Sequence, residues 1–447
     1  MEGFGRAPFM IRMSELESGK RGLAIVGLGY VGLSLVGGFG KAFGRVLGFD
    51  INKERVAELQ KGIDRNKELT PGDLKRLSVE YTTNPAKLRE SSFTIIAVPT
   101  PVDDNKLPDL SALKLASSIV GENLTRGSIV VYESTVYPGV TEDICMPILE
   151  ETSKFRCGKD FKVGYSPERI NPGDRTHSLQ NVIKIVAGQD GETTRYIANV
   201  YKKVVKANIY EAPNIKTAEA AKVIENIQRD INIALINEIA IICSGMGLDT
   251  QEVLSAAGTK WNFMRFEPGL VGGHCLSVDP YYLAHKSLQI GHYPEVILAG
   301  RKVNNYIGKY VAHRMIKNLI QAGKSLKDCK VLILGIAFKE NVCDTRNSKV
   351  VDIAEELKEY GVHVLVHDPV VTRTEVLKRY PSLEFVERCE EANPYDGIVA
   401  AVKHDVFIKG SLKRLRKLCN SNPILEDVKG VFPRREAVKL GFRYSRL

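Results

Sequence analysis

Short apolar runs alternate with amphipathic stretches over much of the chain, a pattern typical of parallel sheets covered by helices. In the first half, strands are expected at residues 23–26, 46–49, 94–98, 128–132, 162–165 and 182–187. A helix is expected at 32–43, directly after the first strand. Residues 1–20 show no clear period and are expected to form a polar N-terminal tail. The first α/β domain is therefore predicted to cover residues 21–210.

Near residue 210 the alternation stops and long helical periodicity begins. Apolar residues recur at helical spacing over 216–245, and further helices are expected at 250–257 and 295–322. This helical segment, 211–322, is either a connector or, as we favour, the interface of a homodimer or larger homo-oligomer. Alternation then resumes, with strands expected at 330–335, 362–366 and 397–402 and a helix at 350–360. The predicted fold is α/β, with two Rossmann-like doubly wound domains, 21–210 and 323–447, joined by a long-helix central domain.

The first expected strand and helix are joined by the sequence GLGYVG at 27–32, a GxGxxG pattern. In such a turn the first glycine allows a tight bend and the second lets a pyrophosphate approach the backbone. The third lets the helix pack close to the strand. Asp50 follows the second strand, where a carboxylate binds ribose hydroxyls and repels a 2′-phosphate. The pattern predicts NAD rather than NADP, although Arg55 weakens this preference. A glycine-rich helix start without a ligand is the alternative.

The segment from Gly272 to Asp279 suggests covalent chemistry. Two glycines precede His274 and Cys275 and leave the thiol open, and Asp279 lies one turn further if a helix begins there. The alternative is that Cys275, like most cysteines, is a small buried hydrophobe. His274 is a weaker candidate for its base, because adjacent side chains often point apart.

Other polar residues fall where ligands bind in α/β proteins. Lys222 and Asn226 lie four residues apart on the expected long helix. They form either a solvated stripe or a pair that faces a cleft between the two α/β halves and stabilises an oxyanion. Glu168 and Thr135 each follow an expected strand, where sheets of this kind bind ligands. Both are equally compatible with capping a turn.

Composition changes this picture little. The chain is 44% hydrophobic and 26% charged, which excludes disordered and fibrous classes. Eight scattered cysteines without a CxxC or Cys/His cluster predict no metal site and a reducing, cytoplasmic location. The net charge is +10, but bases and acids are interleaved, so a small polyanionic ligand is favoured over nucleic acid. Residues 22–40 are uncharged, yet their glycines favour the nucleotide turn over a membrane span; no membrane contact is expected.

Seven segments together resemble a known family. They are GLGYVGL (27–33), VPTPVD (98–103), ESTVYPG (133–139), SPERINPG (166–173), EAAKVIEN (219–226), PGLVGGHCLSVDPYYL (268–283) and GIAFKENVCDTRNS (335–348). From about residue 21 to 440 the chain resembles the UDP-glucose/GDP-mannose dehydrogenase family, and within it the branch acting on UDP-N-acetylhexosamines. The resemblance implies NAD-dependent four-electron oxidation of a UDP-sugar at C6, through a thiohemiacetal and a thioester on Cys275. UDP-N-acetylglucosamine or UDP-N-acetylgalactosamine is favoured over UDP-N-acetylmannosamine and UDP-glucose.

The resemblance also implies residue roles. The catalytic residues are Cys275, Lys222, Asn226, Asp279, Glu168 and Thr135. The cofactor-binding residues are Gly27, Gly29, Tyr30, Val31, Gly32, Asp50, Arg55, Thr100, Thr135 and Arg346. The substrate-binding residues are Glu168, Arg169, Lys222, Asn226, Gly272 and Lys339. The turn at 335–339 lacks the glycine triad, so a second dinucleotide is not expected there. The resemblance implies that this turn binds the nucleotide diphosphate of the substrate.

Two other functions remain open at this stage. A two-electron hydroxyacid dehydrogenase would use Lys222 as its base, but it leaves Cys275 and residues 330–447 without a role. A non-catalytic nucleotide-sensing module is the third hypothesis. The joint presence of Cys275, Lys222, Asn226 and Asp279 argues against it.

Overall fold

The computed structural model of the chain describes residues 11–66, 68–169 and 178–447. These residues form two units, each of which is described by itself. The first contains residues 1–225, as far as they are described, together with 281–292. The second contains residues 226–280 and 293–447. The predicted domain boundaries at residues 20, 210 and 322 stay predictions.

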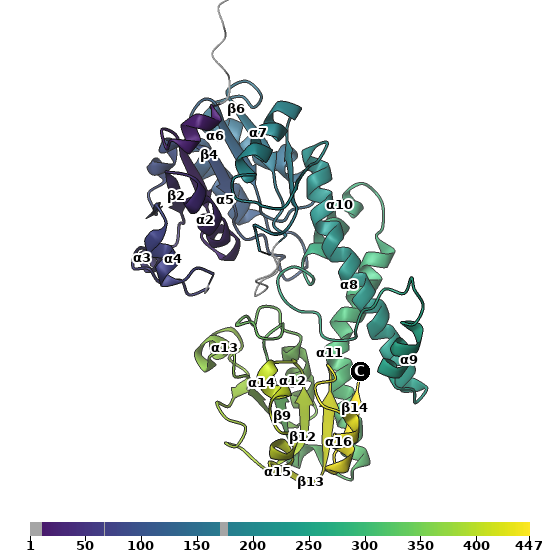
Figure 1. Cartoon of the computed structure of the whole chain (residues 1–447). Coiled ribbons are helices and arrows are strands. Elements are labelled where there is room, and N and C mark those ends of the chain that lie inside the picture. The colour runs from purple at the N-terminus through teal and green to yellow at the C-terminus, as the bar shows by residue number, and fades with distance from the viewer. Residues whose placement is uncertain (1–10, 67, 170–177) are drawn as a thin grey trace, which may run out of the picture. The chain divides into compact units, whose positions relative to one another are not determined.

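The described residues of the first unit contain one sheet in the order β3-β2-β1-β4-β5-β6-β7-β8 (Figure 1). Its strands are β1 Gly22–Val26, β2 Val46–Phe49, β3 Val79–Thr82, β4 Ser91–Ile96, β5 Ser128–Tyr132, β6 Phe161–Tyr165, β7 Lys184–Gly188 and β8 Ile209–Glu211. Strands β1 to β6 run parallel, and β7 is antiparallel to β6. Because β1 lies between β2 and β4, the carboxyl end of β1 is the topological switch point at which such sheets bind ligands.

Helices cover both faces of this sheet, since β1, β4, β5 and β6 are buried along their whole length. Leu33, Val36 and Phe39 of α2 pack in one core with Leu23 of β1. Leu16 of α1 is buried in the same core, although residues 1–20 were expected to form a polar tail. The helices are α1 Met13–Glu17, α2 Tyr30–Ala42, α3 Lys53–Gln60, α4 Pro71–Arg76, η1 Pro85–Glu90, α5 Ser111–Glu122, η2 Thr141–Cys145, α6 Met146–Ser153 and α7 Gly191–Tyr201.

The long helices of the middle segment agree with the sequence pattern to within one residue. They are α8 Ile215–Gly245, α9 Thr250–Ala257 and α11 Glu295–Gln321, and the shorter α10 Asp279–Gln289 lies between the last two. Within the described residues, none of the helices combines the length and the apolar character that a bilayer span requires.

The second unit contains a parallel sheet in the order β11-β10-β9-β12-β13-β14. Val331 and Ile333 of β9 pack with α11 and α12, whereas Leu332 and Leu334 pack with α15 and α16 on the opposite face. This is the doubly wound arrangement predicted for the second half. The elements are η3 Leu326–Asp328, β9 Lys330–Leu334, α12 Val350–Glu359, β10 His363–His367, α13 Arg373–Arg379, β11 Glu384–Phe385, β12 Tyr395–Ala400, α14 Asp405–Ile408, α15 Leu412–Lys417, β13 Cys419–Asp427, α16 Arg434–Lys439 and β14 Arg443–Arg446.

Candidate active site

The glycines of the first turn have different spatial roles. Gly27 has a φ of +92°, and a Cβ there would lie 2.7 Å from the Ala97 carbonyl oxygen. A Cβ on Gly32 would lie 1.8 Å from the Gly27 oxygen. Gly29 has no heavy atom within 4 Å of its Cβ position, so it leaves open space before the first turn of α2. Because the first N–H groups of a helix have no acceptor within the helix, this opening fits the pyrophosphate of a dinucleotide.

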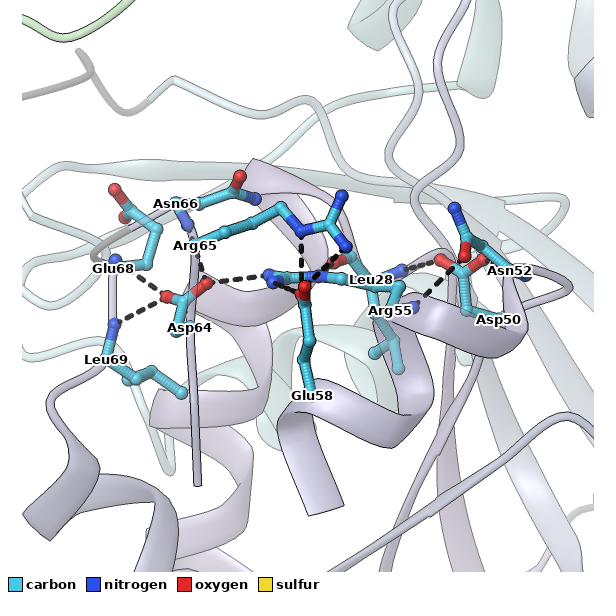
Figure 2. Close-up of polar contacts among 10 residues, drawn as sticks. All are labelled: Leu28, Asp50, Asn52, Arg55, Glu58, Asp64, Arg65, Asn66, Glu68 and Leu69. Carbon is cyan, nitrogen blue, oxygen red and sulfur yellow. Dashed lines mark hydrogen bonds and ion pairs between the residues drawn. The ribbon is translucent and has the colours of Figure 1, made fainter. Parts of the chain in front are cut away.

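Asp50, just beyond β2, fixes the backbone of this turn (Figure 2). One of its oxygens accepts the N–H of Leu28 at 2.7 Å and the other accepts the N–H of Asn52 at 2.8 Å. The carbonyl of Leu28 accepts a hydrogen bond from Nε of Arg55 at 3.0 Å. The Leu28 residue is therefore held on both sides, while the carboxylate keeps lone pairs that can accept ribose hydroxyls. The acidic turn fits NAD.

Arg55 lies inside the domain and pairs with Asp64 (Figure 2). The Arg55 side chain is 7% exposed and its Nη2 lies 2.7 Å from Asp64 Oδ1, which is fully buried. Asp64 also accepts the backbone N–H groups of Asn66, Glu68 and Leu69 at 2.8–3.0 Å. Asp64 thus compensates the positive charge of Arg55, which had weakened the sequence-based preference for NAD over NADP. Direct contact of Arg55 with the cofactor stays a prediction, and no sequence motif pointed to Asp64.

Three more predicted residues follow the next three strands of the sheet, β4, β5 and β6. Thr100 follows β4 and donates from its hydroxyl to the carbonyl of Thr135, which follows β5, at 2.7 Å. Glu168 follows β6 and is 9% exposed. Because β1, β4, β5 and β6 are adjacent and parallel, these residues share the sheet edge that carries the glycine turn.

A buried ion pair that the sequence analysis missed supports this edge. Lys184 Nζ lies 2.7 Å from Glu133 Oε2, and both side chains are at most 4% exposed. The same ammonium donates to the carbonyl of Pro167 at 2.9 Å, and the Tyr201 hydroxyl donates to the other Glu133 oxygen. Burial raises the pKa of Glu133 to about 7, against the opposing charge of Lys184. The pair connects the backbone positions directly before Ser134 and Glu168.

The long helix α8 carries two residues that were predicted to be catalytic, Lys222 and Asn226. Lys222 is buried at 8% exposure, and Asn226 donates from Nδ2 to Asp279 Oδ2 at 2.5 Å. Arg169, predicted to bind substrate, lies 2.9 Å from Glu225 and donates to the carbonyl of Ile183 at 2.7 Å. Its guanidinium therefore already has protein partners in this structure. The segment 170–177, which includes part of the SPERINPG motif, lies outside the described residues.

Cys275 lies on the surface directly before α10. Its side chain is exposed, and its carbonyl accepts the N–H groups of Val278 and Asp279 at 3.0 and 2.8 Å. The helix begins at Asp279, which is 2% exposed. Burial, and next the charge of Arg346, lower the pKa of His274, so its imidazole is neutral at neutral pH. A neutral His274 supplies no positive charge to stabilise a thiolate.

The second turn, after β9, differs from the first. Asp368 follows β10 and accepts the N–H groups of Ile336 and Ala337 at 2.7 and 2.9 Å. His404 Nε2 lies 3.1 Å from the same oxygen. Two N–H groups of this turn are thus bonded to Asp368, whereas in the first turn Asp50 accepts the N–H of Leu28.

The loop beyond this second turn carries the remaining predicted ligand contacts. Lys339 lies in it and is half-buried. The guanidinium of Arg346 pairs with Asp344 at 2.6 Å. In the described residues, no cluster of three or more His, Cys, Asp or Glu is placed to hold a metal ion.

Comparisons with known proteins agree with this geometry. Three models of the UDP-glucose/GDP-mannose dehydrogenase family match in succession: the NAD binding domain at 21–205, the central domain at 216–306 and the UDP binding domain at 332–434. Protein CapL of Staphylococcus aureus is 50% identical over 411 residues, which cover 92% of this chain and 96% of that protein. A UDP-N-acetyl-D-glucosamine 6-dehydrogenase of Salmonella typhi is 48% identical, covering 93% and 97%. The solved structure of a UDP-D-ManNAc dehydrogenase from Pyrococcus horikoshii matches with a TM-score of 0.87 at 29% identity, covering 95% and 98%. The chain therefore belongs to the UDP-glucose/GDP-mannose dehydrogenase family and is an NAD-dependent oxidoreductase.

Proposed function

We propose that this enzyme oxidises C6 of UDP-N-acetyl-D-glucosamine to the uronic acid, a four-electron reaction that reduces two NAD+. The sugar is supported by the 48% identity to the Salmonella typhi enzyme of that name, against 33% to the UDP-N-acetyl-D-mannosamine dehydrogenase of Pyrococcus horikoshii. The reaction rests on one observation: an exposed Cys275 stands one turn before Asp279, which is hydrogen-bonded to Asn226.

Each chemical step uses groups of this chain. When bound at the glycine turn, NAD+ supplies the acceptor for the hydride that leaves C6. In this first oxidation the C6 hydroxyl proton passes to a base. Cys275 Sγ then adds to the aldehyde carbon, and the thiol proton is transferred through a base to the carbonyl oxygen, giving a thiohemiacetal. Loss of a second hydride and of the hydroxyl proton leaves a thioester. Water then cleaves the C–S bond, which releases the carboxylate and restores the thiol.

The remaining roles follow from charge and hydrogen bonding. Lys222 and Asn226 stabilise the oxyanion of the tetrahedral intermediates. Asp279 and Glu168 take and return protons, a contribution of roughly 10²–10⁴-fold for general acid–base catalysis. Thr135 positions water or cofactor, and the loop of Lys339 binds the UDP group.

The reaction class and the sugar are tested together. The enzyme is incubated with NAD+ and, separately, with UDP-N-acetylglucosamine, UDP-N-acetylgalactosamine, UDP-N-acetylmannosamine and UDP-glucose. We expect two NADH per sugar and the mass of the uronate, with UDP-N-acetylglucosamine turned over fastest. One NADH per substrate would support a two-electron dehydrogenase instead, and preference for another sugar would overturn the assignment.

The thiol is tested by Cys275→Ser. We expect this variant to lose uronate formation while it keeps its fold and NAD binding, because serine is a far weaker nucleophile at neutral pH. Cys343→Ser, at another exposed cysteine, is the control and should retain activity. Circular dichroism, NADH fluorescence titration and product mass measure the three properties. Full activity of the Cys275 variant would reject covalent catalysis.

The same proposal extends to assembly and setting. We propose a homodimer or larger homo-oligomer that forms through α8, where Leu235 and Ile242 are 53% and 55% exposed two turns apart. Scattered cysteines favour a cytoplasmic location. An activated uronic acid is a building block for polysaccharide synthesis, and we propose that role for the product.

A further inference from the structure

The segment that carries the thiol, residues 258–278, contains no helix or strand, and the structure describes all of it. Its backbone is therefore held by other elements. Gly269 exchanges two hydrogen bonds with the side chain of Asn237 at 2.8 and 3.0 Å. The carbonyl of Leu276 accepts from Arg301 at 3.2 Å. Between these two anchors lies Gly273, two residues before Cys275.

Gly273 is held by the loop that follows β9. Its N–H donates to the carbonyl of Arg346 at 3.1 Å, and its carbonyl accepts from the Asn347 amide at 3.0 Å. The Ser277 hydroxyl donates to the same carbonyl. Two of these three contacts come from consecutive residues of a distant part of the sequence, so the loop determines where this peptide lies.

The glycine pair allows the two segments to touch. A Cβ on Gly272 would lie 2.7 Å from the Asn347 carbonyl oxygen, and one on Gly273 would lie 2.7 Å from the ring of Phe338. Gly273 also has a φ of +84°, which favours glycine. Any larger residue would push the thiol segment away from the loop.

Each of these contact residues is the sequence neighbour of a residue that was predicted to bind a ligand. Phe338 directly precedes Lys339, and Asn347 directly follows Arg346. We infer that Asn347 and Phe338 are positioning residues: they hold the Gly273 peptide, so that capture of the UDP group by the same loop places the Cys275 thiol for attack. This inference rests on the proposed function and deepens it.

Asn347→Asp is the decisive variant. Asn347 is exposed, and aspartate keeps its size and its left-handed φ of 49°, so the core is not disturbed. The substitution replaces the NH₂ donor with an oxygen that repels the Gly273 carbonyl. Asn341→Asp is the matched control, because Asn341 lies in the same loop, has a φ of 59° and donates to Asp405, away from the thiol.

The readout is the alkylation rate of Cys275 by iodoacetamide, with and without UDP, measured by peptide mass spectrometry. Cys389, which is half-buried and lies outside this loop, serves as the internal reference. We expect UDP to change the Cys275 rate relative to Cys389 in the wild type and in Asn341→Asp, and this effect to vanish in Asn347→Asp. With substrate, kcat of Asn347→Asp should fall about tenfold, the equivalent of one good hydrogen bond, with KM for NAD+ unchanged.

An Asn347→Asp enzyme that still binds UDP by calorimetry and shows the wild-type response of Cys275 would overturn the inference. So would a wild-type thiol that does not respond to UDP. If Asn347→Asp does not fold, Asn347→Gly keeps the φ value, removes the same amide and must give the same result. Alkylation needs neither the sugar nor NAD+, so a wrong substrate assignment would leave this test intact.

Discussion

Beside the first glycine turn, Arg55 and Asp64 form an ion pair in which both side chains are buried away from solvent. Removing one member of such a pair leaves a buried charge without compensation. Asp64 has an additional role, because it also accepts three backbone N–H groups. Its side chain therefore links the guanidinium behind the turn to Asn66, Glu68 and Leu69.

We predict that Asp64→Asn lowers the free energy of unfolding by about 3 kcal/mol and weakens NAD binding, because Arg55 then holds Leu28 less firmly. Glu17→Gln is the matched control. Glu17 pairs with Lys203 on the surface at 2.6 Å, and its side chain is 41% exposed, so a loss below about 1 kcal/mol is expected. Urea unfolding and NADH titration measure both quantities. Equal losses of unfolding free energy in the two variants would show that the buried ion pair contributes no more to stability than a surface pair.

A second residue-scale prediction concerns Glu219 on α8. It accepts the N–H groups of Gly139 and Thr141 at 2.6 and 2.9 Å, yet burial raises its pKa from 4.5 to about 7. Between these two values the folded state binds a proton that the unfolded state has lost. The contribution of Glu219 to stability is thus complete below pH 4.5 and is lost as the pH rises through about 7.

Glu219→Gln should therefore flatten the pH dependence of stability. We expect the wild-type Tm to fall more than the variant Tm between about pH 5 and pH 8, by the equivalent of roughly 3 kcal/mol or less. Thermal unfolding at four pH values across this range measures the difference. Parallel curves for the two proteins would contradict the assignment.

Single residues could be predicted where the backbone geometry demands a particular residue type, because that demand is visible in the sequence. The glycine turn and Asp50 belong to this class, and the structure places the turn between β1 and α2 and Asp50 directly after β2. Asp64, Glu133 and Lys184 were not predictable, because a buried charge is recognised only by its partner. Lys184 and Glu133 are 51 residues apart in sequence and meet because the sheet folds them together.

At the scale of elements, two glycines of the turn between β1 and α2 have different roles. One is required for packing of the helix, and the other leaves room for NAD. Gly32→Ala forces a Cβ to within 1.8 Å of the Gly27 oxygen, whereas Gly29→Ala meets nothing within 4 Å. We predict that Gly32→Ala lowers Tm by several degrees, as expected for about 1–3 kcal/mol of overpacking. Gly29→Ala should keep Tm and lose NAD affinity instead, because its methyl group occupies the opening.

The paired variants are compared by differential scanning fluorimetry and NADH titration. Unchanged NADH affinity in a folded Gly29→Ala enzyme would show that the opening is not the pyrophosphate site.

Elements with a strong hydrophobic pattern were located well, and weakly patterned elements were missed. The buried central strands and the long helices agree closely with expectation. One exception is β13, whose second half is buried inside the second sheet but which was not expected. Strands β3, β8, β11 and β14 were not expected either, and each is a sheet edge with few buried positions. Their pairing comes from the neighbouring strand rather than from their own apolar alternation. The short α1 was missed for the same reason, since only Leu16 of its five residues is buried.

For the whole molecule, the exposed Leu235 and Ile242 of α8 support the proposed oligomer. We predict that Leu235→Asp combined with Ile242→Asp converts this proposed oligomer to monomers, since burial of each side chain contributes about 1.5–3 kcal/mol. Val438→Asp on α16 is the control, because Val438 is similarly exposed at 56% but lies elsewhere. Light scattering after size exclusion gives the masses. A monomeric wild type, or a double variant of unchanged mass, would refute this interface.

The different ligands of the two nucleotide-binding domains have a consequence for timing. The first glycine turn lies in the part that matches an NAD binding domain and the second turn in the part that matches a UDP binding domain, so the repeated fold offers one dinucleotide pocket. Two successive oxidations must then share that pocket, with spent cofactor departing and fresh cofactor arriving in between. In the proposed mechanism the sulfur–carbon bond to Cys275 retains the half-oxidised sugar through this exchange, and its lifetime has to exceed the residence time of NADH.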